Sequence, residues 1–152
     1  MSDRLSPAKL RDLVGQELGV SEWFVMTQDR IDVFADCTED RQWIHVDRER
    51  AAQGPFKSTV AHGFLVLSLL PHWLALLPLF QTKFRAVVNY GLDRVRFVNS
   101  VKPGDRIRGR AVLRAVERKG LSRLLAKIEC TVEIEGSEKP ALVSESLALF
   151  FL

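Results

Sequence analysis

The pattern of hydrophobic and polar positions changes about halfway along the chain. In the first half apolar residues recur at helical spacing, and one helical face after the capping residue Thr27 carries Ile31, Phe34, Ala35 and Thr38. In the second half apolar and polar residues alternate, as they do along strands that bury one face. This change predicts helices first and an antiparallel sheet afterwards, which is an α+β fold.

Five segments of the second half suit extended chain and are separated by turn-forming residues. They span residues 84–90, 94–101, 105–116, 122–135 and 141–152. Alternation is clearest in the fourth, where Leu124, Ile128 and Val132 share one face and Lys127 and Glu129 share the other. Such a sheet has one wet face and one dry face, and the dry face needs a cover.

An apolar segment at 61–70 supplies that cover, because a helix that is hydrophobic on all sides must be enclosed by other structure. The wider apolar run 60–80 approaches the length of a membrane span, but Pro71 and Pro78 interrupt it. We therefore predict one domain, residues 1–152, in which a long, curved antiparallel sheet wraps around a central helix.

Shorter elements precede the apolar helix. Ser6-Pro7 can start a helix that ends near Gly15 or Gly19. Aromatic and branched residues predict a strand at 21–26, and 47–53 predicts another short helix.

Composition narrows the possible functions. The 152 residues are 47% hydrophobic and 27% charged with a formal net charge of +3, which permits anionic ligands without requiring nucleic acid. The N-terminus has no apolar signal region, and Cys37 and Cys130 have neither metal-ligand nor disulfide spacing. We expect a cytoplasmic protein with reduced thiols and with no metal, nucleic-acid or membrane partner.

Groups able to move protons gather upstream of the apolar helix. Asp40 and His45 are five residues apart, so they point apart on a continuous helix and converge only if the chain bends near 41–43. On such a bend a carboxylate and an imidazole can hold a water and exchange its protons. The alternative is that Asp40 caps a helix and His45 is a surface histidine. Asp36 and Asp47 suit solvated or capping roles.

The segment Thr59-Val60-Ala61-His62-Gly63 leads directly into the apolar helix. Free N–H groups at a helix N-terminus can stabilise a developing oxyanion, and Gly63 has no side chain to obstruct a carbonyl. The alternatives are that Gly63 only permits close packing and that His62 is structural or capping instead of a second base. Asn89 and Tyr90, at the end of a predicted strand, can border a pocket.

Arginines follow one face of two predicted strands, at Arg106, Arg108 and Arg110 and at Arg94 and Arg96. They suit either a site for phosphate groups or a solvated basic face.

Several of these residues together resemble the hydratase motif of the MaoC-like proteins. The motif is carried by Phe34-Ala35, Thr38-Glu39-Asp40 and Ile44-His45, followed by Ala61-His62-Gly63-Phe64, Asn89-Tyr90-Gly91-Leu92, Arg96-Phe97 and Val101-x-x-Gly104-Asp105. The letters QWIHVD around His45 are most similar to the NodN-like branch with its (R)-specific enoyl-CoA hydratases. The family usually has glycine where this chain has Glu39.

The resemblance implies a hot dog fold and a homodimer with an acyl-CoA substrate along the subunit interface. It implies hydration of trans-2-enoyl-CoA to (3R)-3-hydroxyacyl-CoA with no cofactor, since CoA enters as part of the substrate. Asp40 and His45 would activate the water, and the amide of Gly63 would polarise the thioester carbonyl. The substrate-binding positions that we expect are Thr59, Ala61, His62, Asn89 and Tyr90.

Two other functions stay open at this point. Hot dog thioesterases usually place a lone carboxylate on the central helix, and the segment 61–70 has no acidic residue. A non-catalytic acyl-CoA-binding subunit would not need both Asp40 and His45.

Overall fold

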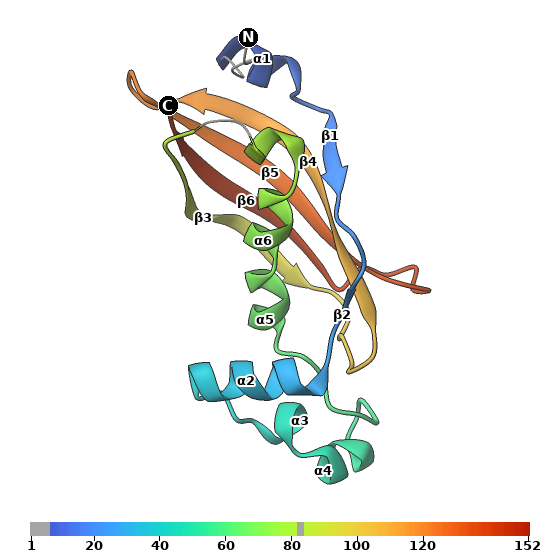
Figure 1. Ribbon diagram of the computed structural model, residues 1–152. Helices are drawn as coiled ribbons and strands as arrows, with labels where there is room; N and C mark the ends of the chain where they lie inside the picture. Colours follow the sequence, from blue (N-terminus) through green and yellow to red (C-terminus); the bar gives the residue numbers. More distant parts are fainter. Residues whose placement is uncertain (1–6, 82–83) are drawn as a thin grey trace.

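The computed structural model describes residues 7–81 and 84–152, and in it a curved sheet wraps around a pair of helices (Figure 1). The sheet has six strands in the order β1-β4-β5-β6-β3, with β2 also paired to β4. Every pairing is antiparallel. The strands are β1 (Glu17–Val20), β2 (Phe24–Val25), β3 (Ala86–Phe97), β4 (Arg106–Arg118), β5 (Arg123–Ile134) and β6 (Leu142–Phe151). The predicted α+β fold is confirmed.

The helices form two groups in Figure 1: α5 and α6 run one after the other across the sheet, and α2, α3 and α4 lie together beyond one end of it. Their bounds are α1 (Pro7–Asp12), α2 (Gln28–Thr38), α3 (Trp43–Val46), α4 (Arg48–Gln53), α5 (Gly63–Ser68) and α6 (Leu70–Ala75), followed by the 3₁₀ helix η1 (Pro78–Gln81). Buried Leu65, Val66, Leu70 and Trp73 come from α5 and α6, so these two helices cover the dry face of the sheet.

The central helix differs from the prediction at both ends. It begins at Gly63 instead of Ala61, and after a break at Leu69 it continues as α6 to Ala75. This break lies just before Pro71, in agreement with the expected interruption there. Pro71 itself fits in the first turn of α6, where its missing N–H would have no intrahelical partner.

The N-terminal segment was predicted to stay helical as far as Gly15 or Gly19, and this is wrong. Helix α1 ends at Asp12, and Glu17–Val20 forms strand β1 along the edge of β4. Pairing with the exposed edge of a long strand outweighs the local preference for helix. The predicted strand at 21–26 shrinks to Phe24–Val25. The predicted capping residue, Ser6, lies outside the described residues.

The segments 84–90 and 94–101, predicted as two strands with a turn at Gly91, form the single strand β3. Its register against β6 shifts between Asn89 and Gly91 and again between Leu92 and Arg94. Gly91 therefore belongs to a bulge. Because β6 offers a continuous partner, the ladder accommodates the glycine as an irregularity and does not end there.

The outer face of the sheet carries ion pairs between neighbouring strands. Arg106 pairs with Glu135 at 2.8 Å, while Arg108 and Arg110 share Glu133 at 2.7 and 2.8 Å. These guanidinium groups already have carboxylate partners, so of the two interpretations the solvated face is favoured over a phosphate site.

Within the described part of the chain no helix combines the length and the apolar character needed to cross a membrane. Both cysteines are free thiols, with Cys37 exposed and Cys130 buried on β5. Burial raises the pKa of the Cys130 thiol to about 11.

Trp73 packs so closely on β4 that only glycine fits beneath it. A Cβ atom added at Gly109 would lie 2.7 Å from Cε3 of Trp73. We expect Gly109→Ala to lower the free energy of unfolding by about 1–3 kcal/mol through overpacking, measured by urea denaturation. The exposed Ala115→Ser on the same strand is the control, expected within about 0.5 kcal/mol of wild type. Equal stability of all three proteins would contradict this packing.

Candidate active site

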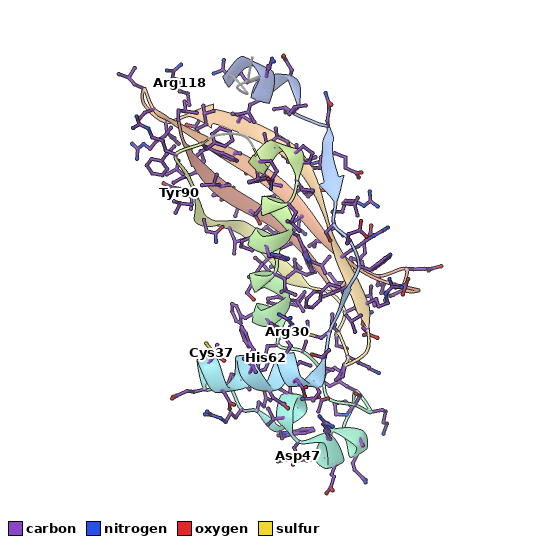
Figure 2. All side chains as sticks on the ribbon, viewed as in Figure 1. Arg30, Cys37, Asp47, His62, Tyr90 and Arg118 are labelled. Atoms are coloured by element: carbon purple, nitrogen blue, oxygen red, sulfur yellow. The ribbon has the colours of Figure 1, made fainter. Side chains whose placement is uncertain are left out.

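Asp40, His45 and His62 come together in one cluster. Figure 2 shows His62 of this cluster where the helical group meets the start of α5. One side-chain ligand atom from each lies within 4.8 Å of the other two. Asp40 is exposed, whereas His45 and His62 are buried. Residues 22 positions apart in the chain are thus brought to one place at the end of the central helix.

A reversal of the chain between α2 and α3 brings Asp40 and His45 together. Helix α2 ends at Thr38, and its C-cap residue Glu39 has φ 64° and ψ 10°, in the left-handed region. Helix α3 then starts at Trp43. The expected bend is present, and it begins at the position where MaoC-like proteins usually have glycine, the residue that adopts this conformation without strain.

Gln28, in the first turn of α2, ties three segments of the site together. Its Nε2 donates to the backbone carbonyl of His45 at 2.8 Å and to Oδ1 of Asp32 at 2.7 Å. Its Oε1 accepts from the hydroxyl of Thr59 at 2.5 Å. Both amide hydrogens and the amide oxygen are used, so this buried polar group is satisfied. No pattern in the sequence distinguishes Gln28 from a surface glutamine, and the sequence analysis missed it.

The same network sets the proton positions on His45. Its Nδ1 lies 2.6 Å from the carbonyl oxygen of Val60, and a carbonyl can only accept, so Nδ1 carries the hydrogen. Nε2 is left with a free lone pair. Burial, reinforced by the adjacent His62, lowers the pKa of His45 from its usual value, although the Val60 hydrogen bond and Asp40 oppose this change. At neutral pH His45 is therefore an imidazole base with Nε2 available.

Gly63 is the first residue of α5, so its N–H has no intrahelical carbonyl to bond. The residue also packs against a ring, since an added Cβ would lie 2.9 Å from Cδ1 of Phe97. A cavity of about 330 Å³ opens beside it, lined in part by His45, Val66 and Asn99. Close packing and an available amide, the two alternatives raised for Gly63, are thus both compatible with its position.

The remaining expected substrate-binding residues fall in two places. Ala61 lines the cavity beside Gly63, and its N–H donates to the carbonyl of Val101 at 2.7 Å. Thr59 is buried and does not line this cavity. Asn89 and Tyr90 line a separate groove of about 290 Å³ between β3 and the central helices. Figure 2 shows Tyr90 on β3, well away from His62 in the view.

Asp36 and Asp47 have the solvated and capping roles predicted for them. Asp36 pairs with Arg41 at 3.2 Å on the surface. Asp47 accepts from the backbone N–H of Arg50 at 3.0 Å and caps α4.

The Asp40, His45 and His62 cluster is better arranged for proton transfer than for holding a metal ion. The rings of His45 and His62 stack with centroids 3.7 Å apart and an interplanar angle of 23°. Nearly parallel rings cannot direct their in-plane lone pairs at one ion. Moreover, Nε2 of His62 lies 2.9 Å from the carbonyl oxygen of Asp40 and so must carry a hydrogen.

Comparison with known proteins places this geometry in a family. The MaoC like domain matches residues 9–133. The chain is 44% identical over 146 residues to 3-hydroxyacyl-thioester dehydratase Z of Mycobacterium tuberculosis (strain ATCC 25618 / H37Rv), covering 95% of each protein. It is 48% identical over 147 residues to nodulation protein N of Rhizobium leguminosarum bv. viciae, covering 95% of this chain and 91% of that one. The solved structure of the (R)-hydratase from A. caviae involved in PHA biosynthesis aligns with a TM-score of 0.73 and 21% identity, over 89% of this chain and 94% of that one.

The curved sheet around a central helix is the hot dog fold, and the matching family and relatives define a hydro-lyase of that class. The chain belongs to the MaoC-like dehydratase family and is similar to its NodN-like members. The predicted family, fold and enzyme class are confirmed.

The lowered pKa of His45 predicts how stability depends on pH. In the unfolded chain a histidine titrates near 6.5, whereas folded His45 takes up its proton only at lower pH. As pH falls below about 6.5 the unfolded state binds more protons, and the folded protein loses stability. We expect an NMR titration of His45 to show a midpoint below 6.5. Unfolding measured at pH 5 and pH 7.5 should show a smaller pH dependence for His45→Gln than for wild type; an unchanged dependence would contradict the assignment.

Proposed function

We propose that the protein hydrates trans-2-enoyl-CoA to (3R)-3-hydroxyacyl-CoA and catalyses the reverse dehydration. The observation that carries the proposal is His45, whose Nδ1–H is bonded to Val60 and whose Nε2 is free beside Asp40. The similarity to a 3-hydroxyacyl-thioester dehydratase supports the substrate class.

In the proposed reaction Nε2 of His45 takes a proton from water as the water oxygen bonds to C3 of the enoyl thioester. The electrons of the C2=C3 double bond move toward the thioester oxygen, where the N–H of Gly63 stabilises the enolate. The imidazolium of His45 then delivers its proton to C2. Asp40 orients the water by accepting its second hydrogen. Acid–base catalysis of this kind contributes about 10²–10⁴-fold, and one oxyanion donor about 10²–10³-fold.

In this proposal the cavity beside Gly63 and the groove along β3 bind different parts of the substrate. The thioester lies in the cavity beside Gly63, and the acyl chain extends into the groove lined by Leu67, Leu74 and Tyr90. This groove follows the next turns of the central helix, so a chain leaving the thioester can enter it. Asn89 and Tyr90 would then contact the acyl chain and not the reacting atoms.

The hydratase is favoured over a thioesterase because α5 and α6, whose sequences are GFLVLS and LPHWLA, carry no carboxylate. A non-catalytic binding subunit would have no use for a buried imidazole held in one tautomer beside an aspartate. Release of free thiol from acyl-CoA, with no hydration, would favour the thioesterase.

We expect Asp40→Asn and His45→Gln each to lower kcat for hydration of crotonyl-CoA by at least about 10²-fold. The loss of enoyl absorbance measures the rate, and circular dichroism checks the fold. Asp36→Asn is the matched control, since Asp36 lies nearby on α2 but pairs with Arg41 at the surface. If Asp40→Asn or His45→Gln kept the wild-type kcat, the substituted residue would have no catalytic role.

The proposal includes a homodimer formed through β3. This strand ends the sheet, and its exposed apolar side chains Val88, Tyr90 and Leu92 are 46%, 61% and 44% accessible. An unpaired apolar edge of this length needs cover.

We expect sedimentation velocity at micromolar concentration to show a dimer for wild type and a shift to monomer for Val88→Asp. Leu121→Asp, 89% accessible in the β4–β5 turn, should stay dimeric. A fully active wild-type monomer would contradict the dimer.

A further inference from the structure

His62 is a buried titratable residue that the proposed reaction does not use. It is the N-cap of α5, only 2% of it is exposed, and its ring contacts those of His45 and Phe34, with centroid distances of 3.7 and 4.9 Å. Burial of a polar ring costs free energy unless hydrogen bonds compensate for the lost water. The contacts of His62 are therefore informative.

One of these contacts holds the turn that carries Asp40. The Nε2–H of His62 donates to the backbone carbonyl of Asp40 at 2.9 Å. Within the described residues Asp40 makes one other hydrogen bond, a long local one of 3.5 Å from its own N–H to the hydroxyl of Thr38. Its carboxylate is half exposed and lies 4.0 Å from the same Nε2. His62 therefore connects the Asp40 turn to the body of the site.

The second contact sets the plane of the His45 ring. The hydrogen bond from Nδ1 to Val60 fixes one atom of that ring but still allows the ring to rock about it. Stacking on His62, with an interplanar angle of 23°, restricts this motion. The direction of the free Nε2 lone pair is thereby defined.

The hydrogen-bond pattern of His62 differs from that of His45. Its Nε2 carries a hydrogen for the Asp40 carbonyl, and its Nδ1 is buried with no hydrogen-bond partner among the residues described. In His45 the hydrogen is on Nδ1, which donates to Val60, and Nε2 is the free nitrogen. Each of the two stacked rings is thus bonded to the backbone through a different nitrogen.

We propose that His62 is a positioning residue that holds the Asp40 turn by its Nε2–H and the His45 ring by stacking, so that both face the same water. This inference rests on the proposed hydration reaction and assigns His62 a role in the same site without contact to the substrate.

Two substitutions separate the two contacts. His62→Phe keeps a ring against His45 but removes the donor to Asp40, and His62→Gln keeps a donor but removes the ring. We expect each to lower kcat for crotonyl-CoA by about 10–10²-fold, because misplacement of a catalytic group by about 1 Å has effects of that size. KM should stay within about two-fold of wild type. His72→Gln, an exposed histidine of α6, is the control and should retain wild-type kcat.

A double-mutant cycle then tests whether His62 acts through Asp40. In an Asp40→Asn background the additional effect of His62→Phe should shrink to less than about three-fold, since coupled residues are not additive. A full, additive effect would overturn the proposal, as would wild-type kcat in both His62 variants. A large rise in KM with kcat unchanged would also overturn it, because it would make His62 a substrate contact.

An NMR measurement on the enzyme without substrate tests the positioning role of His62 without relying on catalytic activity. Imidazole ¹⁵N spectra should show His45 as the single Nδ1–H tautomer in wild type and in His62→Phe, with broadened or mixed signals in His62→Gln. Identical His45 spectra in wild type and His62→Gln would overturn the stacking role even if both fold. If wild type hydrated no enoyl-CoA, the proposed reaction would fail, while these spectra would still report on the positioning contact.

Discussion

Burial of the apolar pair α5 and α6 inside the curve of the sheet is the constraint on which the site depends. Trp73 sits on Gly109 with no space for a Cβ, so the helix cannot move closer to the sheet or rotate against it. This fixes the start of α5 and the segment 59–62 that leads into it. That segment supplies the Val60 carbonyl to His45 and carries His62, so the packing of the helix also constrains the His45 ring.

Burying two histidines at this end of the core has an electrostatic cost, and the network around them shows how it is offset. Burial lowers the pKa of His45, its Nδ1 is bonded to the Val60 carbonyl, and Asp40 lies nearby. Gln28 satisfies the His45 backbone carbonyl and the Thr59 hydroxyl at once. The exception is Nδ1 of His62, which stays unpaired within the described residues. Unsatisfied buried atoms are rare in folded proteins, and this one belongs to the ring that stacks on His45.

The fold was largely predictable because it rests on periodicity and on turns. The alternation along 122–135 identified β5 to within a residue at each end, and the all-apolar segment 61–70 identified the element that the sheet encloses. The errors arose where pairing between strands overrides local preference. Strand β1 was predicted as helix but pairs with the edge of β4, and Gly91 was predicted as a turn but forms a bulge in β3. Asp40, His45 and Gly63 could be proposed from chemistry and family resemblance, whereas Gln28 and the stack of His62 on His45 are contacts between segments that spacing does not show.

The turn between α2 and α3 begins at Glu39, and its conformation brings Asp40 close to His45. A continuous helix would point Asp40 and His45 apart, so the chain must reverse there, and the reversal uses a left-handed residue at φ 64°. For a residue with a Cβ that conformation costs about 1–2 kcal/mol, and glycine would avoid the cost. The hydrogen bond from His62 to the carbonyl of the next residue, Asp40, connects this turn to the start of α5. The left-handed conformation of Glu39 and the hydrogen bond from buried His62 therefore act at the same turn, the one that places the Asp40 carboxylate near the His45 imidazole.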